Sequence, residues 1–466
     1  GTVGDSVVVN YVNPGAPNAT LSVSTVGNNV TVSLATDANG TIISTANDIV
    51  AAINGNSSTN GTVGAGLASG SDGSGVVGTG AFNLGNGIDP ASSAVTLTAI
   101  NPFTGTTTVD AGTLILGNSL AIENSILAVN SGGGAVSFGS LISATMGGLS
   151  GNGSIALKNQ SDAPVTLTLG ENNQSSTFTG VIAGNSTGSG SLVKIGSGVL
   201  TLSGFNTYTG GTIIEAGLID FNTIKSFGNG GSDSLTLLGG GIQWAAGTAS
   251  DLTAILNPVL NTGPTSDLNT LDTNGNNVQI TTPFSGVAGI IKAGTGCLTL
   301  VGNNTFFGPT IINQGTLQLG NGLTNGLLIN SGLINNATLV FDEASDITYS
   351  QILSGTGSVV QSGTNTNLTL TGINTFTGGT SITSGTLVVG NSLALQNSTL
   401  TYDNSTAGVL AFDHGITAVT LGGLNSPLST NPGNAIQLQN LDGNAVALSI
   451  GNNNANTTFT GVISGN

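Results

Sequence analysis

One sequence unit recurs along this chain, and the recurrence limits what the chain can fold into. Copies occupy residues 191–221, 290–320 and 358–390, and a partial copy occupies residues 101–117. In each copy, short alternations of apolar and polar residues are separated by Gly, Asn and Thr, a pattern typical of strands between tight turns. A single unit of this kind cannot bury its apolar face alone, so neighbouring units stack. The sequence therefore predicts a β-solenoid.

The composition supports a folded β-protein. Of the 466 residues, 75 are Gly, only 5% are charged, 4% are aromatic, and the mean hydropathy is +0.29. Disordered chains are low in hydrophobicity and high in charge, so this chain is unlike them. The same composition suits many short Val, Leu and Ile strands with turns of Gly and Asn and an outer face of Thr, Ser and Asn.

The charge balance excludes several partners. The chain has 21 acidic residues, a net charge of −17, no arginine, and the lysines Lys158, Lys194, Lys225 and Lys292. We therefore expect no nucleic acid binding, because neutralisation of the phosphates needs a basic patch on the protein. No run of 18 apolar residues occurs, so we expect no membrane insertion by this chain. A single cysteine also excludes an internal disulfide framework.

Residues 1–89 predict a small α/β module. Residues 6–11 indicate a buried strand, and residues 19–35 indicate a hairpin with its turn at residues 27–29. Thr45 is expected to cap one helix with Asp48 in its first turn, Ile49, Val50 and Ile53 on its apolar face, and its end near residues 54–55. The boundary to the remaining chain, residues 90–466, is expected at residues 85–90, after which strands and turns alternate.

A longer cycle overlies the repeat. The fragments of residues 118–169 return at residues 391–450, with an offset of 273 at Gly117 and Gly390 and of 281 at Phe178 and Phe459. The eight-residue difference predicts an insertion, placed at residues 426–433 as a loop on the flank of the solenoid. Both ends of the chain interrupt a module, so we expect the coil near Phe459 to stack on further β-structure. Either the chain continues as further repeats, or copies of it associate end to end.

The recurring unit resembles a known family. Residues 198–219, 296–319 and, less fully, 367–389 carry the pattern G-x-L-x-L-x-G-x-N-T-[YF]-T-G-G-T-x-I-x-x-G-T-L-x-L, with Pro309 in place of the second Gly of T-G-G-T. This pattern resembles the autotransporter-associated β-strand repeat of bacterial passenger domains. The resemblance implies a right-handed parallel β-helix outside a bacterial cell. At about 20 to 25 residues per coil, residues 91–466 would form about 15 to 18 coils.

The N-T-[YF]-T-G-G-T segments carry a prediction about register. Their Asn, Thr and Gly residues are expected at turns and outer strands. The rings of Tyr208, Phe306 and Phe376 occupy equal places in the three copies. We expect them to lie in register along one edge of the solenoid.

Some β-helical proteins are glycosidases or polysaccharide lyases, so the acidic and basic residues of this chain are candidates for catalysis. Glycoside hydrolysis needs two carboxylates facing one groove. The densest acidic group, Asp342, Glu343 and Asp346, has no basic neighbour in sequence and is predicted to be a solvated loop. Lys194 and Lys292 occupy the same place in two copies, where the third copy has Gln361. A position that accepts Gln is predicted to face outward and not to act as a base.

Three other sites have weaker patterns. His414 stands alone beside Asp413 and is predicted to be a turn residue. Cys297 occupies an ordinary strand position and is predicted to have no special role. Oxygen ligands at alternate positions, Asp272, Asn274 and Asn276, are candidates for a calcium loop, although the EF-hand pattern fails.

These observations favour a structural function. We expect no catalytic residues, no cofactor other than the calcium candidate, and a segment of a bacterial surface fibre, stalk or matrix filament. The alternatives are an adhesin that binds surfaces or glycans through its flank loops, and a β-helical carbohydrate-active enzyme or tailspike-like depolymerase. The expected partners are copies of the chain or further repeats end to end, and surface glycans.

Overall fold

The computed structural model describes residues 8–27, 29–57, 64–66, 72, 74–77, 79–83, 94–260, 268–329, 332–403, 407–426 and 435–465. The chain forms two compact units, residues 1–94 with 111–113, and residues 95–110 with 114–466. The predicted boundary at residues 85–90 lies outside the described residues, and so does the predicted insertion at residues 426–433 except for Ser426.

The described residues of the first unit contain one sheet and one helix. Its sheet has the order β2-β3-β1-β4 and contains β1 (Val8–Val12), β2 (Ser22–Val26), β3 (Asn29–Ser33) and β4 (Gly80–Asn83). The pairing of β2 with β3 is antiparallel, which confirms the hairpin, and β1 runs parallel to β3. The core of this unit consists of buried side chains from the sheet and the helix, namely Val9, Val30, Val32, Leu34, Ile49 and Ile53.

The helix α1 (Ala46–Asn54) begins as the sequence predicts. The Thr45 hydroxyl accepts a hydrogen bond from the Asp48 N–H at 3.3 Å, and the Asp48 carboxylate accepts one from the Thr45 N–H at 2.8 Å. This reciprocal capping box satisfies two amides that the helix itself leaves free. Ile49 and Ile53 are buried, one turn apart on one face, and Gly55 ends the helix.

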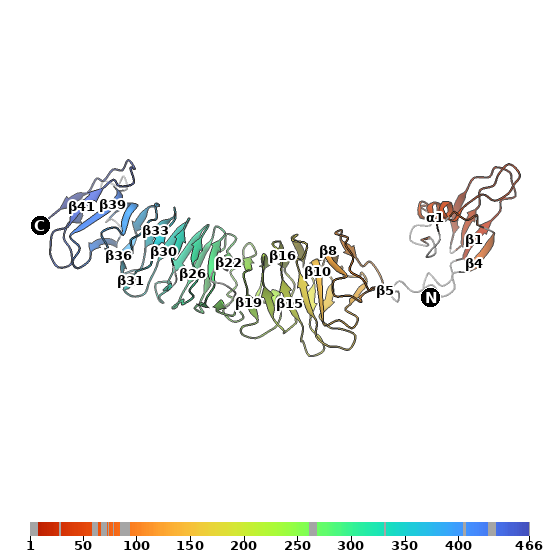
Figure 1. Ribbon diagram of the computed structural model, residues 1–466, viewed down its shortest axis with the longest axis horizontal. Helices are drawn as coiled ribbons and strands as arrows, with labels where there is room; N and C mark the ends of the chain where they lie inside the picture. The colour runs from red at the N-terminus through yellow and green to blue at the C-terminus, as the bar shows by residue number, and fades with distance from the viewer. Residues whose placement is uncertain are drawn as a thin grey trace. The chain divides into compact units, whose positions relative to one another are not determined.

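The second unit is a parallel β-solenoid of about 17 turns. Across both units, 44% of the structure is strand and 3% is helix. Figure 1 shows its strands stacked coil on coil from β8 to β41. Each coil pairs in parallel with the coils before and after it; Leu192, for example, pairs with Leu167 on one side and with Thr212 on the other. The fold class predicted from the repeats is thereby confirmed.

Three long sheets hold most of the strands. The first sheet contains β6 (Thr107–Thr108), β8 (Ile122–Ala128), β10 (Ser143–Ser150), β12 (Thr166–Leu169), β15 (Ser191–Lys194), β17 (Thr212–Ile214) and β19 (Leu235–Leu237). The second sheet contains β13 (Ser176–Phe178), β16 (Val199–Leu202), β18 (Leu218–Phe221), β20 (Gly241–Trp244), β22 (Leu268–Asp272), β25 (Gly289–Ala293), β27 (Thr310–Ile312), β29 (Leu333–Asn335) and β32 (Leu353–Ser354). The third sheet contains β23 (Val278–Ile280), β26 (Cys297–Leu300), β28 (Thr316–Leu319), β30 (Thr338–Phe341), β33 (Ser358–Gln361), β35 (Thr380–Ile382), β37 (Leu395–Thr401), β39 (Ala418–Asn425) and β41 (Ala447–Ile450).

Shorter sheets complete the coils. They pair β5 (Ala94–Leu97), β7 (Thr113–Leu116) and β9 (Ala135–Ser137); β11 (Ser154–Ala156) and β14 (Val181–Ala183); β21 (Val259–Leu260) and β24 (Ser285–Gly286); β31 (Ile347–Tyr349), β34 (Asn367–Leu370), β36 (Ser384–Val389) and β38 (Ala407–Phe412); and β40 (Ala435–Gln437) and β42 (Val462–Ser464). One 3-10 turn, η1, spans Ile224–Phe227.

The alternation of the sequence places every second side chain inside. In β16, Leu200 and Leu202 are buried while Val199 and Thr201 are half-buried, and most other central strands follow the same pattern. Full burial of one such leucine stabilises the fold by about 1.5–3 kcal/mol. These inward rows form one continuous core along the solenoid.

The repeat copies do not share one register, which corrects the sequence prediction. The equivalent strands β15, β25 and β33 lie in the first, second and third long sheets respectively. The copies begin 99 (290 − 191) and 68 (358 − 290) residues apart. Neither distance is a whole number of coils, because each successive copy begins in a different sheet of the solenoid. Accordingly, the Thr207 N–H donates to the carbonyl of Ile182 in β14, whereas the Thr375 N–H donates to the carbonyl of Leu353 in β32.

The three aromatic rings therefore lie on different faces. Tyr208 lies between β16 and β17, Phe306 between β26 and β27, and Phe376 between β34 and β35. All three rings are buried in the core. The prediction of a shared edge is wrong because a coil need not contain a whole repeat unit.

The longer cycle is visible as paired strands. The pair β8 and β10 has a register shift after Met146, and the pair β37 and β39 has one after Leu395. Ile126 pairs with Gly148 and its counterpart Thr399 pairs with Gly423, an offset of 423 − 148 = 275 in the second members. Two of the eight inserted residues therefore precede Gly423, which corrects their placement entirely at residues 426–433.

One side-chain hydrogen bond of the second cycle is missing from the first cycle. The Asn453 side-chain N–H donates to the Thr399 hydroxyl at 2.9 Å, but the equivalent Nδ2 of Asn172 is buried with no partner, because Ile126 replaces the threonine. We expect Ile126→Thr to raise the free energy of unfolding by about 1 kcal/mol, since a buried donor gains its acceptor at the cost of part of a half-buried side chain. Denaturant unfolding measures the change. The reciprocal Thr399→Ile should lower stability, and a loss with Ile126→Thr would contradict the prediction.

Candidate functional site

The two repeat lysines lie inside the solenoid. Lys194 and Lys292 are 1% and 0% exposed, so the prediction that this position faces outward is wrong. Lys194 Nζ donates to the carbonyls of Ile195, Gly196 and Ala216 at 2.6, 2.8 and 3.2 Å. Burial lowers the pKa of each lysine to about 8. Each ammonium is therefore hydrogen-bonded both to its own turn and to the next coil, and it is not placed to act on a substrate.

The second copy has one additional contact. Lys292 Nζ donates to the carbonyls of Ala293, Gly294 and Gln314 at 2.6, 2.7 and 3.1 Å, and to the hydroxyl of Thr273 at 2.9 Å. Thr273 belongs to the preceding coil and Gln314 to the following one. One side chain thus connects three successive coils.

Glu343 is also buried, which corrects the prediction of a solvated acidic loop. The residue is 2% exposed; its Oε2 accepts the Gly326 N–H at 2.7 Å, and its Oε1 is buried without a partner. Burial is the main cause that raises the pKa of Glu343 to about 7, and the neighbouring charge of Asp342 adds to it.

The other two acids of this group have structural partners. Asp342 Oδ2 accepts the Gln318 side-chain N–H at 3.1 Å. Both oxygens of Asp346 accept N–H groups of Asn367, at 2.8 and 2.9 Å. Each of the three carboxyl groups is therefore engaged with a different neighbouring segment.

The asparagines of the N-T-[YF] segments are buried as well. Asn206, Asn304 and Asn374 are inside the solenoid, which corrects the prediction that they lie at turns and outer strands. Asn206 Oδ1 accepts the Ile182 N–H of the preceding coil at 2.8 Å, and its Nδ2 donates to the Ser226 carbonyl of the following coil at 2.6 Å. Asn304 and Asn374 make the equivalent bonds. We call these three residues the asparagine staples.

The calcium candidates participate in turn contacts. Asp272 accepts the Asn274 N–H at 2.8 Å and the Gln243 side-chain N–H at 2.7 Å, and Asn276 accepts the Gly247 N–H at 2.8 Å. The described residues contain no group of three or more His, Cys, Asp or Glu side chains arranged for a metal ion. Calcium binding at this loop stays a prediction.

His414 and Cys297 lie at unremarkable positions of the solenoid. His414 Nδ1 lies 2.6 Å from Asp442 Oδ1 on the surface, and this hydrogen bond raises the pKa of His414. Gly415 also donates to Asp442, at 2.8 Å. Cys297 is half-buried at the start of β26, where burial raises its pKa, so its thiolate is disfavoured.

Asparagine-anchored turns form part of the solenoid flank. In residues 159–163, 185–189 and 440–444, the first residue is Asn, and its Oδ1 accepts the N–H groups of the third and fifth residues at 2.9 to 3.0 Å. The fourth residue has a left-handed backbone, with φ of 59° at Asp162, 85° at Gly188 and 82° at Gly443. These turns were not predicted from the sequence, although an Asn followed by Ser, Asp or Gly is a local turn signal.

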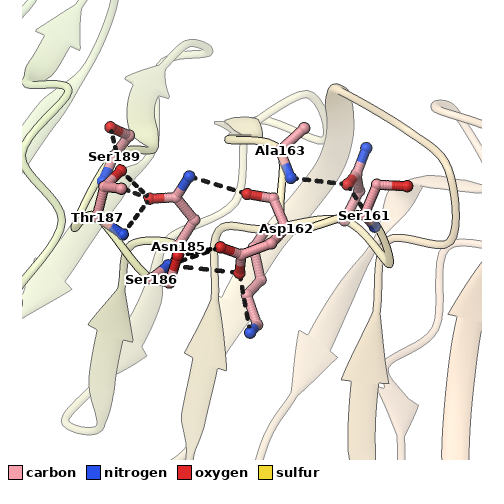
Figure 2. A network of polar contacts seen from close by, with 9 residues as sticks. Ser161, Asp162, Ala163, Asn185, Ser186, Thr187 and Ser189 are labelled. Carbon is pink, nitrogen blue, oxygen red and sulfur yellow. Dashed lines mark hydrogen bonds and ion pairs between the residues drawn. The ribbon is translucent and has the colours of Figure 1, made fainter.

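Two of these turns are stacked on one another, as Figure 2 shows. The Asp162 carboxylate accepts hydrogen bonds from the Ser186 backbone and hydroxyl, and Lys158 Nζ lies 3.1 Å from it. Asn185 Nδ2 donates to the Asp162 carbonyl at 2.9 Å. The charges of Lys158 and Asp162 thus compensate one another, and the turns leave Ser161, Ser186 and Thr187 exposed to solvent.

Two open grooves also occur in the described part of the solenoid. The larger, of about 530 Å³, is lined by Val, Asn, Ser, Gly and Ala residues of the segments 129–135 and 152–154 and by Val181. The smaller, of about 320 Å³, is lined by residues 209–213, 231–234 and 236. Neither lining includes a pair of carboxylates.

Within the described ranges, no helix is long and apolar enough to cross a membrane.

The buried carboxyl group of Glu343 predicts a pH dependence. Its folded pKa of about 7 exceeds the ordinary value of 4.5, so the folded chain binds the extra proton. The stabilisation is complete below pH 4.5 and is lost as the pH rises through 7, by about 3 kcal/mol. Thermal unfolding at pH 5 and pH 8 without metal ions, compared with Glu343→Gln, measures it. An equal pH response in both proteins would contradict the assignment.

Comparisons with known proteins support the family resemblance. The model of the passenger-associated-transport-repeat matches residues 92–116, 192–219, 290–319 and 359–389, which overlap the four predicted copies. The chain is 34% identical over 176 residues to the Adhesin BmaC autotransporter of Brucella suis biovar 1 (strain 1330); the match covers 38% of this chain and 5% of that protein. No solved structure matches the chain. The predicted localisation, extracellular or at the bacterial cell surface, is confirmed.

Proposed function

We propose that this chain, a repeat protein of the autotransporter passenger type, is a structural segment of a bacterial surface fibre, stalk or matrix filament. One observation carries the proposal. The two repeat lysines, Glu343 and the asparagine staples are buried among coil-to-coil contacts. Their hydrogen bonds connect neighbouring coils, which suits an extended structural element whose coils must not separate.

Electron microscopy of the native cell surface tests the structural proposal. Gold-labelled antibodies raised against the full chain should decorate extended surface structures at regular intervals. The expected partners along such structures are further repeats of the same kind, end to end. Decoration of compact, isolated particles would count against a fibre or stalk.

Adhesion is the second candidate function. The matched relative is named an adhesin. The stacked turns at Asn159 and Asn185 expose the hydroxyl-bearing residues Ser161, Ser186 and Thr187, which suit hydrogen bonding with an uncharged partner such as a surface glycan. Beads coated with the chain should then be retained on glycan-bearing surfaces at high salt, where charge attraction is screened. Equal retention of uncoated beads would exclude this function.

We further propose that the chain has no hydrolase or lyase activity. The absence of arginine, the burial of the two repeat lysines and the separate partners of Asp342, Glu343 and Asp346 support this proposal. Polysaccharide turnover that disappears with Asp342→Asn or Glu343→Gln would overturn it.

A further inference from the structure

The position of the repeat lysine is a cage of backbone oxygens. In the first two copies, three carbonyl groups accept hydrogen bonds from the ammonium: two from the residues that follow the lysine and one from the next coil. Three N–H donors of an ammonium match such a set of acceptors. This position, which we call the lysine slot, is therefore built for a cation.

The third copy has the slot without the cation. Gln361 pairs with Ile382 of the next coil, as Lys194 pairs with Ile214, and it is 1% exposed. Its Nε2 donates to the carbonyls of Gly363 and Thr366 at 3.3 and 3.4 Å, longer than most of the lysine bonds. Its Oε1 is buried without a partner.

A carboxylate lies next to this slot. Lys292 pairs with Leu271 and Gln361 pairs with Phe341, so Glu343 occupies the place of Thr273, whose hydroxyl contacts the lysine in the second copy. A Cβ atom added to Gly363 would lie 2.8 Å from the Glu343 carbonyl oxygen, so the two segments are in close contact. Like Gln361 Oε1, Glu343 Oε1 is buried without a hydrogen-bond partner. The third copy thus loses a positive charge where it gains a negative one.

We propose that the corner formed by Glu343 and Gln361 binds a small hard cation from solution, which takes the place of the missing ammonium. Such cations prefer carboxylate, amide and carbonyl oxygens, which are the groups present here. A monovalent ion such as K⁺ is favoured, because one carboxylate balances one charge and the slot accommodates an ammonium elsewhere. A proton on Glu343 competes with the cation, so binding strengthens as the pH rises.

Hydrogen exchange of the full chain tests the proposal. After treatment with EDTA at pH 8, exchange is compared in K⁺, Na⁺ or Ca²⁺ and in tetramethylammonium, which is too large for the slot, at equal ionic strength. Amides of residues 321–326 and 362–366 should exchange roughly tenfold more slowly at about ten times the Kd of the bound ion. Amides near Lys292, where the cation is built in, should not respond. A response to Ca²⁺ alone would support the site and assign it a divalent ion.

Two substitutions separate the explanations. Gln361→Lys supplies an internal ammonium and should make exchange slow in every salt, while Glu343→Gln should abolish the response to cations. Equal slowing at the Lys292 corner would show a general salt effect and overturn the proposal. No response of the original chain to any ion would overturn it as well, and would leave a proton as the occupant of the corner.

Discussion

Replacement of Lys292 by methionine should lower the free energy of unfolding by about 3 kcal/mol at pH 7. The substitution keeps an unbranched side chain in the core but removes four hydrogen bonds from Nζ. Unpaired buried acceptors cost about 1–3 kcal/mol each, and relief of the buried charge, whose pKa falls to about 8, returns about 3 kcal/mol. The lost bonds outweigh this relief. Denaturant unfolding measures the change.

Lys292→Gln is the matched control because Gln361 occupies the equivalent strand position in the third copy. It should cost less than the methionine variant, since its amide retains a donor. The pH dependence provides a second check. The folded pKa of Lys292 lies below its ordinary value of 10.5, so the unfolded chain binds more protons between pH 8 and 10.5. Stability should rise over this range in the original chain and rise less in Lys292→Met. Identical profiles would contradict a buried ammonium.

The repeats were sufficient to predict the architecture. Alternation in segments such as Leu200 to Leu202 predicts which side chains pack inward, and stacking follows because each coil leaves an apolar face uncovered. The helix was equally predictable, because the capping box of Thr45 and Asp48 is local in sequence. These features depend only on neighbouring residues.

The polar interior was missed although part of its signal was present. Lys194 has the same parity as the buried Leu192, and Glu343 has the same parity as Phe341, so alternation places both inside. The charge of these side chains favours an outward position instead, since burial of a charge is costly unless the charge is paired. The partners are backbone groups: carbonyls of its own turn and of the next coil for Lys194, and the Gly326 N–H for Glu343. No pattern of side chains reveals them. The sheet in which each repeat copy begins was also not predicted. It depends on the summed lengths of the intervening coils, which the repeat itself does not specify.

Replacement of Asn304 by leucine should be the most destabilising of these substitutions, at about 4 kcal/mol. Leucine has nearly the same shape but can neither accept nor donate a hydrogen bond. The Phe284 N–H, now bonded to Asn304 Oδ1 at 2.9 Å, would lose its acceptor. The Leu327 and Gly302 carbonyls, bonded to Nδ2 at 3.3 and 3.1 Å, would lose a donor. Asn304 is 1% exposed, so water cannot replace these bonds.

The adjacent residue provides the control for this prediction. Asn303 is exposed, so Asn303→Leu changes the same residue type by the same substitution outside the core and should alter stability by at most about 0.5 kcal/mol. Hydrogen exchange should locate the damage. In Asn304→Leu, amides near Phe284 and Leu328, which flank the staple in the coils before and after, should lose protection first. If both variants unfold alike, the staple contributes no more than a surface asparagine, and the cohesion of the coils must come from the apolar rows alone.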